Sequence, residues 1–274
     1  MPSDLHMHTS FSDGRLTPEE LIAEAKKAGL HYIALTDHDT VDGISHLYES
    51  GLFPTKGIHI IPGIEFSAHH PLHEVHILGY GIDIFCTSLL DKLNEVTDAR
   101  WSRFSEIVEK LNGLGYAITE ADVLAIAGVS KSISRSHIGR VLVKKGYFDS
   151  VRSAFEELLS KGQPAYVPHY RLEVEEVLSL ILAAEGRAVL AHPKLVYDEE
   201  LVERICQMGI DGIEVFYPQH DEDDTAHYLE LAKKYGLLPA GGSDFHGFST
   251  RYPAEIGVFT IPDEYAVPFY RAEN

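Results

Sequence analysis

The stretch DLHMHTSFSDG, residues 4–14, places two histidines at the end of a short apolar run. Side chains alternate between the two faces of a strand, so His6 and His8 point to the same side. Neutral imidazole is a common metal ligand, and a nearby carboxylate can complete or orient such a site. A His-x-His pair alone is weak evidence. Further candidate ligands elsewhere in the chain strengthen the interpretation as a metal site.

Other candidate ligands stand where further strands are predicted to end. Strands are predicted for the apolar runs at 33–36, 58–64, 75–80, 188–191 and 237–242. The run at 75–80 contains one candidate ligand, and each of the other four is followed closely by one or two candidate ligands. In parallel α/β barrels, catalytic groups gather at the carboxyl ends of the strands. Together with His6, His8 and Asp13, the predicted metal ligands are His38, Glu65, His76, His192, Asp244 and His246.

The order of predicted elements indicates the α/β class. A helix is expected to begin at Thr17, with a capping box and Pro18 at its first position. Further helices are expected near 199–209 and 222–235, and a last strand at 256–261. Alternation of strands and helices is typical of a mostly parallel sheet or barrel.

One long segment interrupts the alternation. Between about 88 and 163 no strand is predicted, and apolar residues recur at helical spacing. Helices are expected after Thr119, over 134–145 and over 151–159. We therefore predict a barrel domain formed by 1–87 and 164–274, with a helical insertion, or cap domain, at 88–163.

Composition excludes several classes of protein. The net charge of −19 over 274 residues argues against a long duplex nucleic-acid groove. Cys86 and Cys206 provide neither a disulfide framework nor a thiolate zinc site. No signal peptide or membrane span is visible, so we expect a cytoplasmic protein without a membrane partner. The oligomeric state cannot be read from the chain.

The predicted ligands also restrict the chemistry. Imidazole and carboxylate without thiolate suit Zn²⁺, Mn²⁺ or Fe²⁺. Nine such ligands are too many for one tetrahedral ion, so we expect two or three ions sharing a carboxylate. Glu65 is the best candidate for the bridge. Clustered ions generate hydroxide near neutral pH and support an in-line displacement at phosphorus.

The motifs that carry these residues resemble those of the PHP (polymerase and histidinol phosphatase) superfamily. The matching segments are 4–14, 36–39, 62–65, 191–193 and 242–247. The resemblance implies a distorted (β/α)7 barrel with a trinuclear metal centre, and Asp13 stands where some relatives carry histidine. It implies one ion position at His6, His8, Glu65 and Asp244, a second at Glu65, His76 and His192, and a third at Asp13, His38 and His246.

The insertion resembles a narrower subgroup. Segments 134–138 (SRSHI) and 161–168 (KGQPAYVP) are similar to those of nucleoside 3',5'-bisphosphate phosphatases and 5'-to-3' RNA exonucleases, which commonly have proline at the position of Ser136. The resemblance implies hydrolysis of the 3'-phosphate of a nucleoside 3',5'-bisphosphate, or trimming of short RNA, by a metal-bridging hydroxide. Among the possible ions, we expect Mn²⁺ first and Fe²⁺ or Zn²⁺ as alternatives.

A phosphate ester also needs groups from the protein. Arg135 is the first candidate, because arginine offers a fork matched to phosphate and a predicted helix begins at this residue. Lys161, His169 and His220 are further candidates, and His220 is considered as a proton donor to the leaving oxygen.

Two other interpretations remain open at this point. One is a histidinol-phosphate phosphatase, which would share the metal centre and differ in the cap. The other is a non-catalytic metal-binding module. Activity on histidinol phosphate, with none on nucleotides, would identify the histidinol-phosphate phosphatase. Metal content and a lack of turnover would identify the non-catalytic module.

Overall fold

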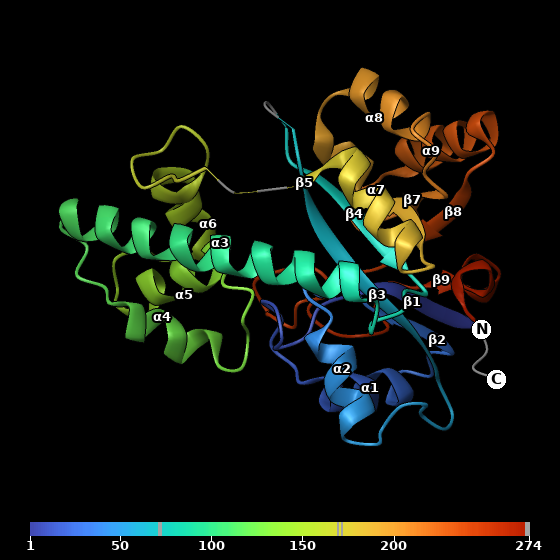
Figure 1. Ribbon diagram of the computed structural model, residues 1–274, viewed down its shortest axis with the longest axis horizontal. Coiled ribbons are helices and arrows are strands. Elements are labelled where there is room, and N and C mark those ends of the chain that lie inside the picture. Colours follow the sequence, from blue (N-terminus) through green and yellow to red (C-terminus); the bar gives the residue numbers. More distant parts are fainter. Residues whose placement is uncertain (71–72, 169, 171, 272–274) are drawn as a thin grey trace.

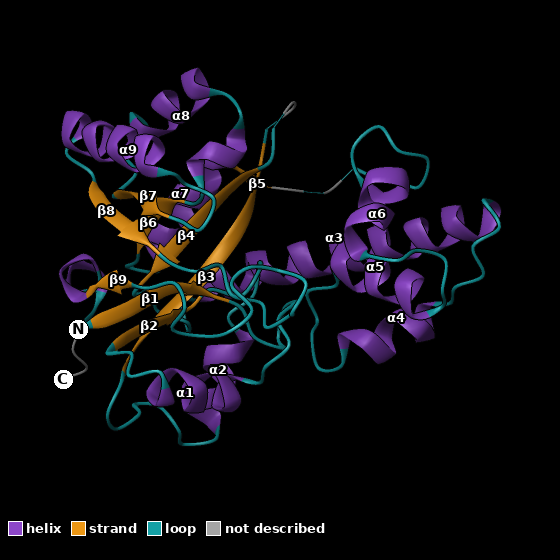
Figure 2. Cartoon of the chain, turned by 180° about the vertical axis from the view of Figure 1, so that it is seen from behind, coloured by secondary structure: helices purple, strands orange, loops and turns teal. Residues whose placement is uncertain are grey.

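The computed structural model describes residues 1–70, 73–168, 170 and 172–271, and its centre is a curled sheet that forms a nearly closed barrel (Figures 1 and 2). Along the sheet the strand order is β8-β7-β6-β4-β3-β2-β1-β9, with β5 beside β3. The strands are β1 (Pro2–Met7), β2 (Tyr32–Leu35), β3 (His59–His69), β4 (Val75–Tyr80), β5 (Leu172–Glu173), β6 (Arg187–Leu190), β7 (Gly212–Phe216), β8 (Leu238–Gly241) and β9 (Ile261–Pro262).

Most neighbouring strands are parallel, as predicted. β1, β2 and β3 run parallel to one another, and so do β6, β7 and β8. β4 is antiparallel to both β3 and β6. The first residues of β4 therefore lie at the same mouth as the carboxyl ends of the parallel strands. A bridge between Met7 and Phe245 brings the chain after β8 beside β1, so that the barrel is nearly closed.

Helices cover the outside of the barrel (Figure 1). The capping box of Thr17 and Glu20 forms as predicted, and α1 begins at Pro18. Burial of Leu21 and Ala25 seats this helix on the sheet. The barrel helices are α1 (Pro18–Lys27), α2 (Asp42–Glu49), α7 (Val174–Ala183), α8 (Glu199–Cys206) and α9 (Glu222–Tyr235), with short 3-10 turns η2 (Pro193–Val196), η3 (Asp263–Tyr265) and η4 (Val267–Phe269).

The strand predicted at 256–261 is wrong in most of its length. Only Ile261 and Pro262 pair with β1, and they do so antiparallel. Gly257 has a φ of +88°, which extended backbone of a strand does not adopt. The apolar run therefore breaks into turns before the short β9.

The insertion is helical, as predicted, and lies to one side of the barrel (Figure 1). The long helix α3 joins the two regions: Leu89 and Leu93 pack with the barrel core, whereas Phe104 and Leu111 pack in a separate cluster with the other insertion helices. These are α3 (Thr87–Gly113), α4 (Glu120–Ala127), α5 (Arg135–Lys144) and α6 (Val151–Ala154), followed by the π-helix η1 (Phe155–Leu159). The proposed domain boundaries at 88 and 163 stay a prediction. None of the helices in the described ranges is long and apolar enough to cross a membrane.

Candidate metal centre

Glu65, in the middle of β3, lies at the centre of the predicted ligands. Its carboxylate is 1% exposed. Oε1 lies 2.7 Å from Nδ1 of His76 and 3.1 Å from Nε2 of His192. Oε2 lies 3.3 Å from Nε2 of His6, 3.2 Å from Nε2 of His8 and 3.0 Å from Nδ1 of His38. The two oxygens therefore face two different groups of histidines.

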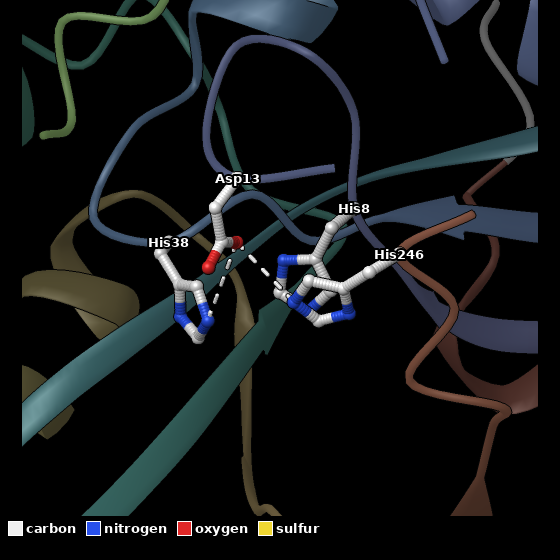
Figure 3. A group of neighbouring side chains, drawn as sticks. All are labelled: His8, Asp13, His38 and His246. Carbon is white, nitrogen blue, oxygen red and sulfur yellow. Dashed lines mark ion pairs between the residues drawn. The ribbon is translucent and has the colours of Figure 1, made fainter. Parts of the chain in front are cut away.

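Asp244 and Asp13 extend the cluster on the side of His8. Oδ1 of Asp244 is 3.2 Å from Nε2 of His8. Figure 3 shows Asp13 facing both His38 and His246, with Oδ1 3.8 Å and 3.2 Å from their Nε2 atoms. All nine predicted ligands are thus brought together at one mouth of the barrel.

In the part of the chain that the structure describes, three groups have ligand atoms close enough to share an ion. The set His6, His8, Glu65 and Asp244 coincides with one expected position. A second set joins Asp13, His38 and His246, as expected, and also includes His8. The third is His38, Glu65 and His76, so His38 takes the place expected for His192. His192 nevertheless contacts the same oxygen of Glu65 as His76 does.

The loop after β1 carries Asp13 back to the mouth because Asp37 holds it. Oδ1 of Asp37 accepts hydrogen bonds from the backbone N–H of Thr9 at 2.7 Å and from the Ser12 hydroxyl at 2.5 Å. Gly14 closes the loop, since a Cβ there would lie 2.3 Å from the carbonyl oxygen of His8. Residues 8–14 therefore form a fixed loop that supplies two candidate ligands, His8 and Asp13.

Three residues at the mouth have left-handed backbone that side chains rarely adopt. They are Asp39, with φ of +49°, His192, with φ of +28°, and Asp244, with φ of +52°. Each follows a strand directly or within a few residues. Backbone strain of this kind costs about 1–3 kcal/mol per residue and collects at functional sites.

The charge and the unpaired ligand atoms of the candidate centre are suited to binding cations. Burial favours the neutral form of Glu65, but the neighbouring His38, His76 and His6 rings hold the pKa of this carboxyl well below its usual range. Within the described residues, several buried ligand atoms have no hydrogen-bond partner, and such orphans are costly unless an ion meets them. They are His6 Nε2, His8 Nε2, Asp13 Oδ1, His38 Nδ1, Glu65 Oε2 and His246 Nε2. This donor set fits divalent ions that accept imidazole and carboxylate.

Further contacts to the candidate ligands come from residues that were not predicted from the sequence. Glu214, in β7, contacts His6, while Tyr217 donates a hydrogen bond to Asp244 at 2.9 Å and Arg251 pairs with the same carboxylate. A signal for Glu214 was present, because it is a charged residue within the apolar run Gly212–Phe216. Tyr217 and Arg251 carry no comparable pattern.

A cavity of about 110 Å³ lies between the centre and the insertion, and three arginines line it together with Asp13, His38 and His76. Arg135 begins α5, and its Nη1 donates to the Leu159 carbonyl at 3.2 Å. Arg100 is 4% exposed and pairs with Asp39, and Nε of Arg103 donates to the Val167 carbonyl at 2.9 Å. Arg135 was predicted, whereas Arg100 and Arg103 were hidden in the helical pattern of α3.

The other predicted substrate residues differ in their placement. Lys161 is exposed and is not among the described residues that line this cavity. His169 lies outside the described residues. His220 lies beside the centre, 5.3 Å from Tyr217 between ring centroids. Its Nδ1 donates to the Val215 carbonyl at 2.8 Å, which leaves Nε2 as an acceptor in the neutral ring. Burial lowers the pKa of His220, which favours that neutral form.

Comparisons with known proteins agree with this geometry. A model of the PHP domain matches residues 4–174. The chain is 34% identical over 249 residues to the 3',5'-nucleoside bisphosphate phosphatase of Chromobacterium violaceum, covering 89% of this chain and 86% of that one. It is 33% identical over 250 residues to the 5'-3' exoribonuclease Rnm of Escherichia coli, covering 89% and 84%.

Two solved structures are similar over nearly the whole chain. One is a Bifidobacterium adolescentis protein named provisionally as a metal-dependent phosphoesterase, with a TM-score of 0.87, 29% identity and coverage of 97% of this chain and 94% of that one. The other is a Chromobacterium violaceum protein described as an amidohydrolase with bound sulfate and no metal. Its TM-score is 0.85 at 32% identity, with coverage of 95% and 91%.

Proposed function

The chain belongs to the PHP domain family, and from this premise we propose that it is a metal-dependent phosphoesterase that removes the 3'-phosphate of nucleoside 3',5'-bisphosphates. The observation that carries the proposal is the cavity between the centre and the insertion. Arg100, Arg103 and Arg135 line it opposite the candidate ligands His38 and His76. A small phosphorylated substrate fits this combination of cations and ligand side chains better than a long nucleic acid does.

The centre would hold two or three divalent ions, with Mn²⁺ expected first. One position would use His6, His8 and Asp244, a second His76 and His192, and a third Asp13, His38 and His246, with Glu65 shared between the first two. The division of the Glu65 oxygens between two groups of histidines supports this bridging role. Bound divalent ions supply hydroxide near neutral pH and offset charge on phosphate oxygens.

The residues of the chain itself bind and orient the ester. Arg135 would present its guanidinium to phosphate as a planar fork, and the dipole of α5, which begins at this residue, favours an anion there. Nη2 of Arg135 donates to Glu74 Oε1 at 2.8 Å. Phosphate would replace this carboxylate.

The proton for the leaving oxygen comes from water in this proposal. His220 would have to be cationic to donate from Nε2, and burial lowers its pKa. Lys161 and His169 remain predicted partners of the phosphate ester. A cytoplasmic location stays a prediction.

A release assay tests the function. Purified protein with Mn²⁺ is expected to free inorganic phosphate from a nucleoside 3',5'-bisphosphate, with the nucleoside 5'-phosphate as the other product. Short RNA with a 5'-phosphate is tested in parallel, because the similar exoribonuclease Rnm acts on RNA. Turnover of histidinol phosphate alone would select the histidinol-phosphate phosphatase, and full metal loading without turnover of any ester would select the non-catalytic module.

A further inference from the structure

Glu214 is a fully buried carboxylate that contacts two candidate metal ligands, His6 and His192. It is 0% exposed and lies in β7, between β6 and β8. We propose that Glu214 is a positioning residue that orients two metal ligands, His6 and His192, toward the two oxygens of Glu65. The inference rests on the metal centre of the proposed function, and it concerns how the chain holds that centre.

The first contact sets the tautomer of His6. Oε1 of Glu214 lies 3.0 Å from Nδ1 of His6. A carboxylate only accepts hydrogen bonds, so the ring hydrogen is placed on Nδ1. In the neutral ring that would bind an ion, Nε2 then keeps its lone pair, and this atom faces Oε2 of Glu65 at 3.3 Å. A carboxylate behind a histidine fixes the orientation of the ring and makes it a better ligand.

The second contact supports the backbone of His192. Oε2 of Glu214 accepts the backbone N–H of His192 at 2.7 Å. This residue has a φ of +28° and precedes Pro193, two conditions that restrict its backbone. The hydrogen bond stabilises a conformation in which Nε2 of His192 lies 3.1 Å from Oε1 of Glu65.

Through these two contacts, Glu214 positions a histidine at each of the two oxygens of the candidate bridging residue Glu65. Glu214 uses one oxygen for His6 and the other for His192, and these histidines face different oxygens of Glu65. Loss of Glu214 should therefore weaken two ion positions together. Among the described residues, Glu214 makes no hydrogen bond or ion pair with Asp13, His38 or His246, so the ion position at these three residues should be spared.

The variant Glu214→Gln tests this arrangement. Glutamine has one acceptor oxygen and an NH₂ group that only donates, so it cannot accept both bonds. Metal-free protein is titrated with Mn²⁺, and free Mn²⁺ is followed by electron paramagnetic resonance. Two ions are expected to bind 10–100-fold more weakly than in the unmodified protein, the usual cost of losing such a partner, with one ion unchanged. Binding equal to that of the unmodified protein would overturn the proposal.

Asp4→Asn is the matched control. Asp4 is also 0% exposed, and it accepts hydrogen bonds from the backbone N–H groups of Ser243 and His6 at 2.9 and 3.3 Å. Both bonds are to backbone rather than to a ligand ring. This variant is expected to keep its Mn²⁺ affinities within about threefold. An equal loss in both variants would show that any buried negative charge suffices, and it would reject the specific role of Glu214.

A measurement on the unmodified protein covers the case in which Glu214→Gln does not fold. Nitrogen-15 correlation spectra of the Zn²⁺-loaded protein are expected to show His6 protonated at Nδ1 and not at Nε2. The opposite tautomer would overturn the proposal. Both tests read metal binding and not turnover. Tight Mn²⁺ binding without phosphate release would therefore reject the proposed substrate while leaving the role of Glu214 standing.

Discussion

Arg135 in the insertion reaches Glu74 beside β4, with Nη2 of the guanidinium 2.8 Å from Oε1 of the carboxylate. The arginine side chain is 14% exposed and the glutamate side chain 57%. This pair joins the insertion to the barrel across the cavity where the three arginines meet the candidate ligands. Because Glu74 is well exposed, the pair is weak enough for a phosphate dianion to displace it.

Replacing Arg135 should therefore weaken substrate recognition. Arg135→Ala is expected to lower kcat/KM for the bisphosphate about 10–100-fold, because one charge-assisted hydrogen-bonding group is worth about 1.5–3 kcal/mol. Arg135→Lys should recover only part of the loss, since a point charge replaces a fork. Steady-state phosphate release measures both.

Arg152→Ala is the matched control for this prediction. Arg152 lies on the same insertion but is 87% exposed and pairs with Glu156 one turn away. Its removal should leave kcat/KM unchanged. Equal losses in Arg135→Ala and Arg152→Ala would show that the insertion acts only through its general charge.

Removal of ligands or ions should abolish turnover. His8→Ala and Asp244→Ala are expected to remain folded and to lose activity at least about 10³-fold, because clustered ions supply the nucleophile in such sites. Chelation should have the same effect, and added Mn²⁺ should restore activity and raise the Tm of the native protein. His227→Ala, which changes an exposed histidine paired with Glu199, should alter none of these quantities.

Gly242 should tolerate no side chain. A Cβ at this position would lie 2.4 Å from the Cβ and from the backbone nitrogen of His6. Gly242→Ala is expected to lower the free energy of unfolding by about 1–3 kcal/mol or more and to reduce activity, because His6 must move. Gly113→Ala, at the end of α3 with open space around its Cβ, should raise stability by up to about 1 kcal/mol. Urea unfolding compares them, and unchanged stability in Gly242→Ala would contradict the close packing at His6.

Stability should fall in mild acid partly through His137. Burial lowers its pKa to about 4, against about 6.5 for an exposed ring. Its Nδ1 accepts the backbone N–H of Ser134 at 3.0 Å, which requires a neutral ring. Between about pH 6.5 and 4 the unfolded chain binds a proton that the folded chain does not, so stability is full above this window and is lost as the pH falls through it. The contribution is about 3 kcal/mol.

His137→Gln provides the comparison for this pH dependence. Glutamine can keep the capping box with Ser134 but does not titrate. The unfolding free energy of the metal-free variant should therefore fall less steeply than that of the unmodified protein between pH 6.5 and 4. Parallel curves over this range would show that His137 is not the group that titrates.

Local sequence patterns predicted much of the fold. The capping box at Thr17 and Glu20, the helix at 222–235 and the strands that precede His38 and His192 depend on a few neighbouring residues, and they appear where expected. Patterns of this range cannot show how β4 runs. Its reversal depends on pairing with β3 and β6, and it explains why His76 stands near the start of its strand and still reaches the mouth.

The sequence by itself determined the α/β class, the helical insertion and the candidate ligands that follow the parallel strands. These follow from periodicity and from the rule that parallel strands end at one edge. Only the tertiary structure decided which oxygen of Glu65 each histidine faces, that Glu214 stands behind His6 and His192, and that Arg100 and Arg103 join Arg135 at the cavity. These contacts join residues far apart in the chain, and their distances depend on barrel closure and helix packing, which no local pattern encodes.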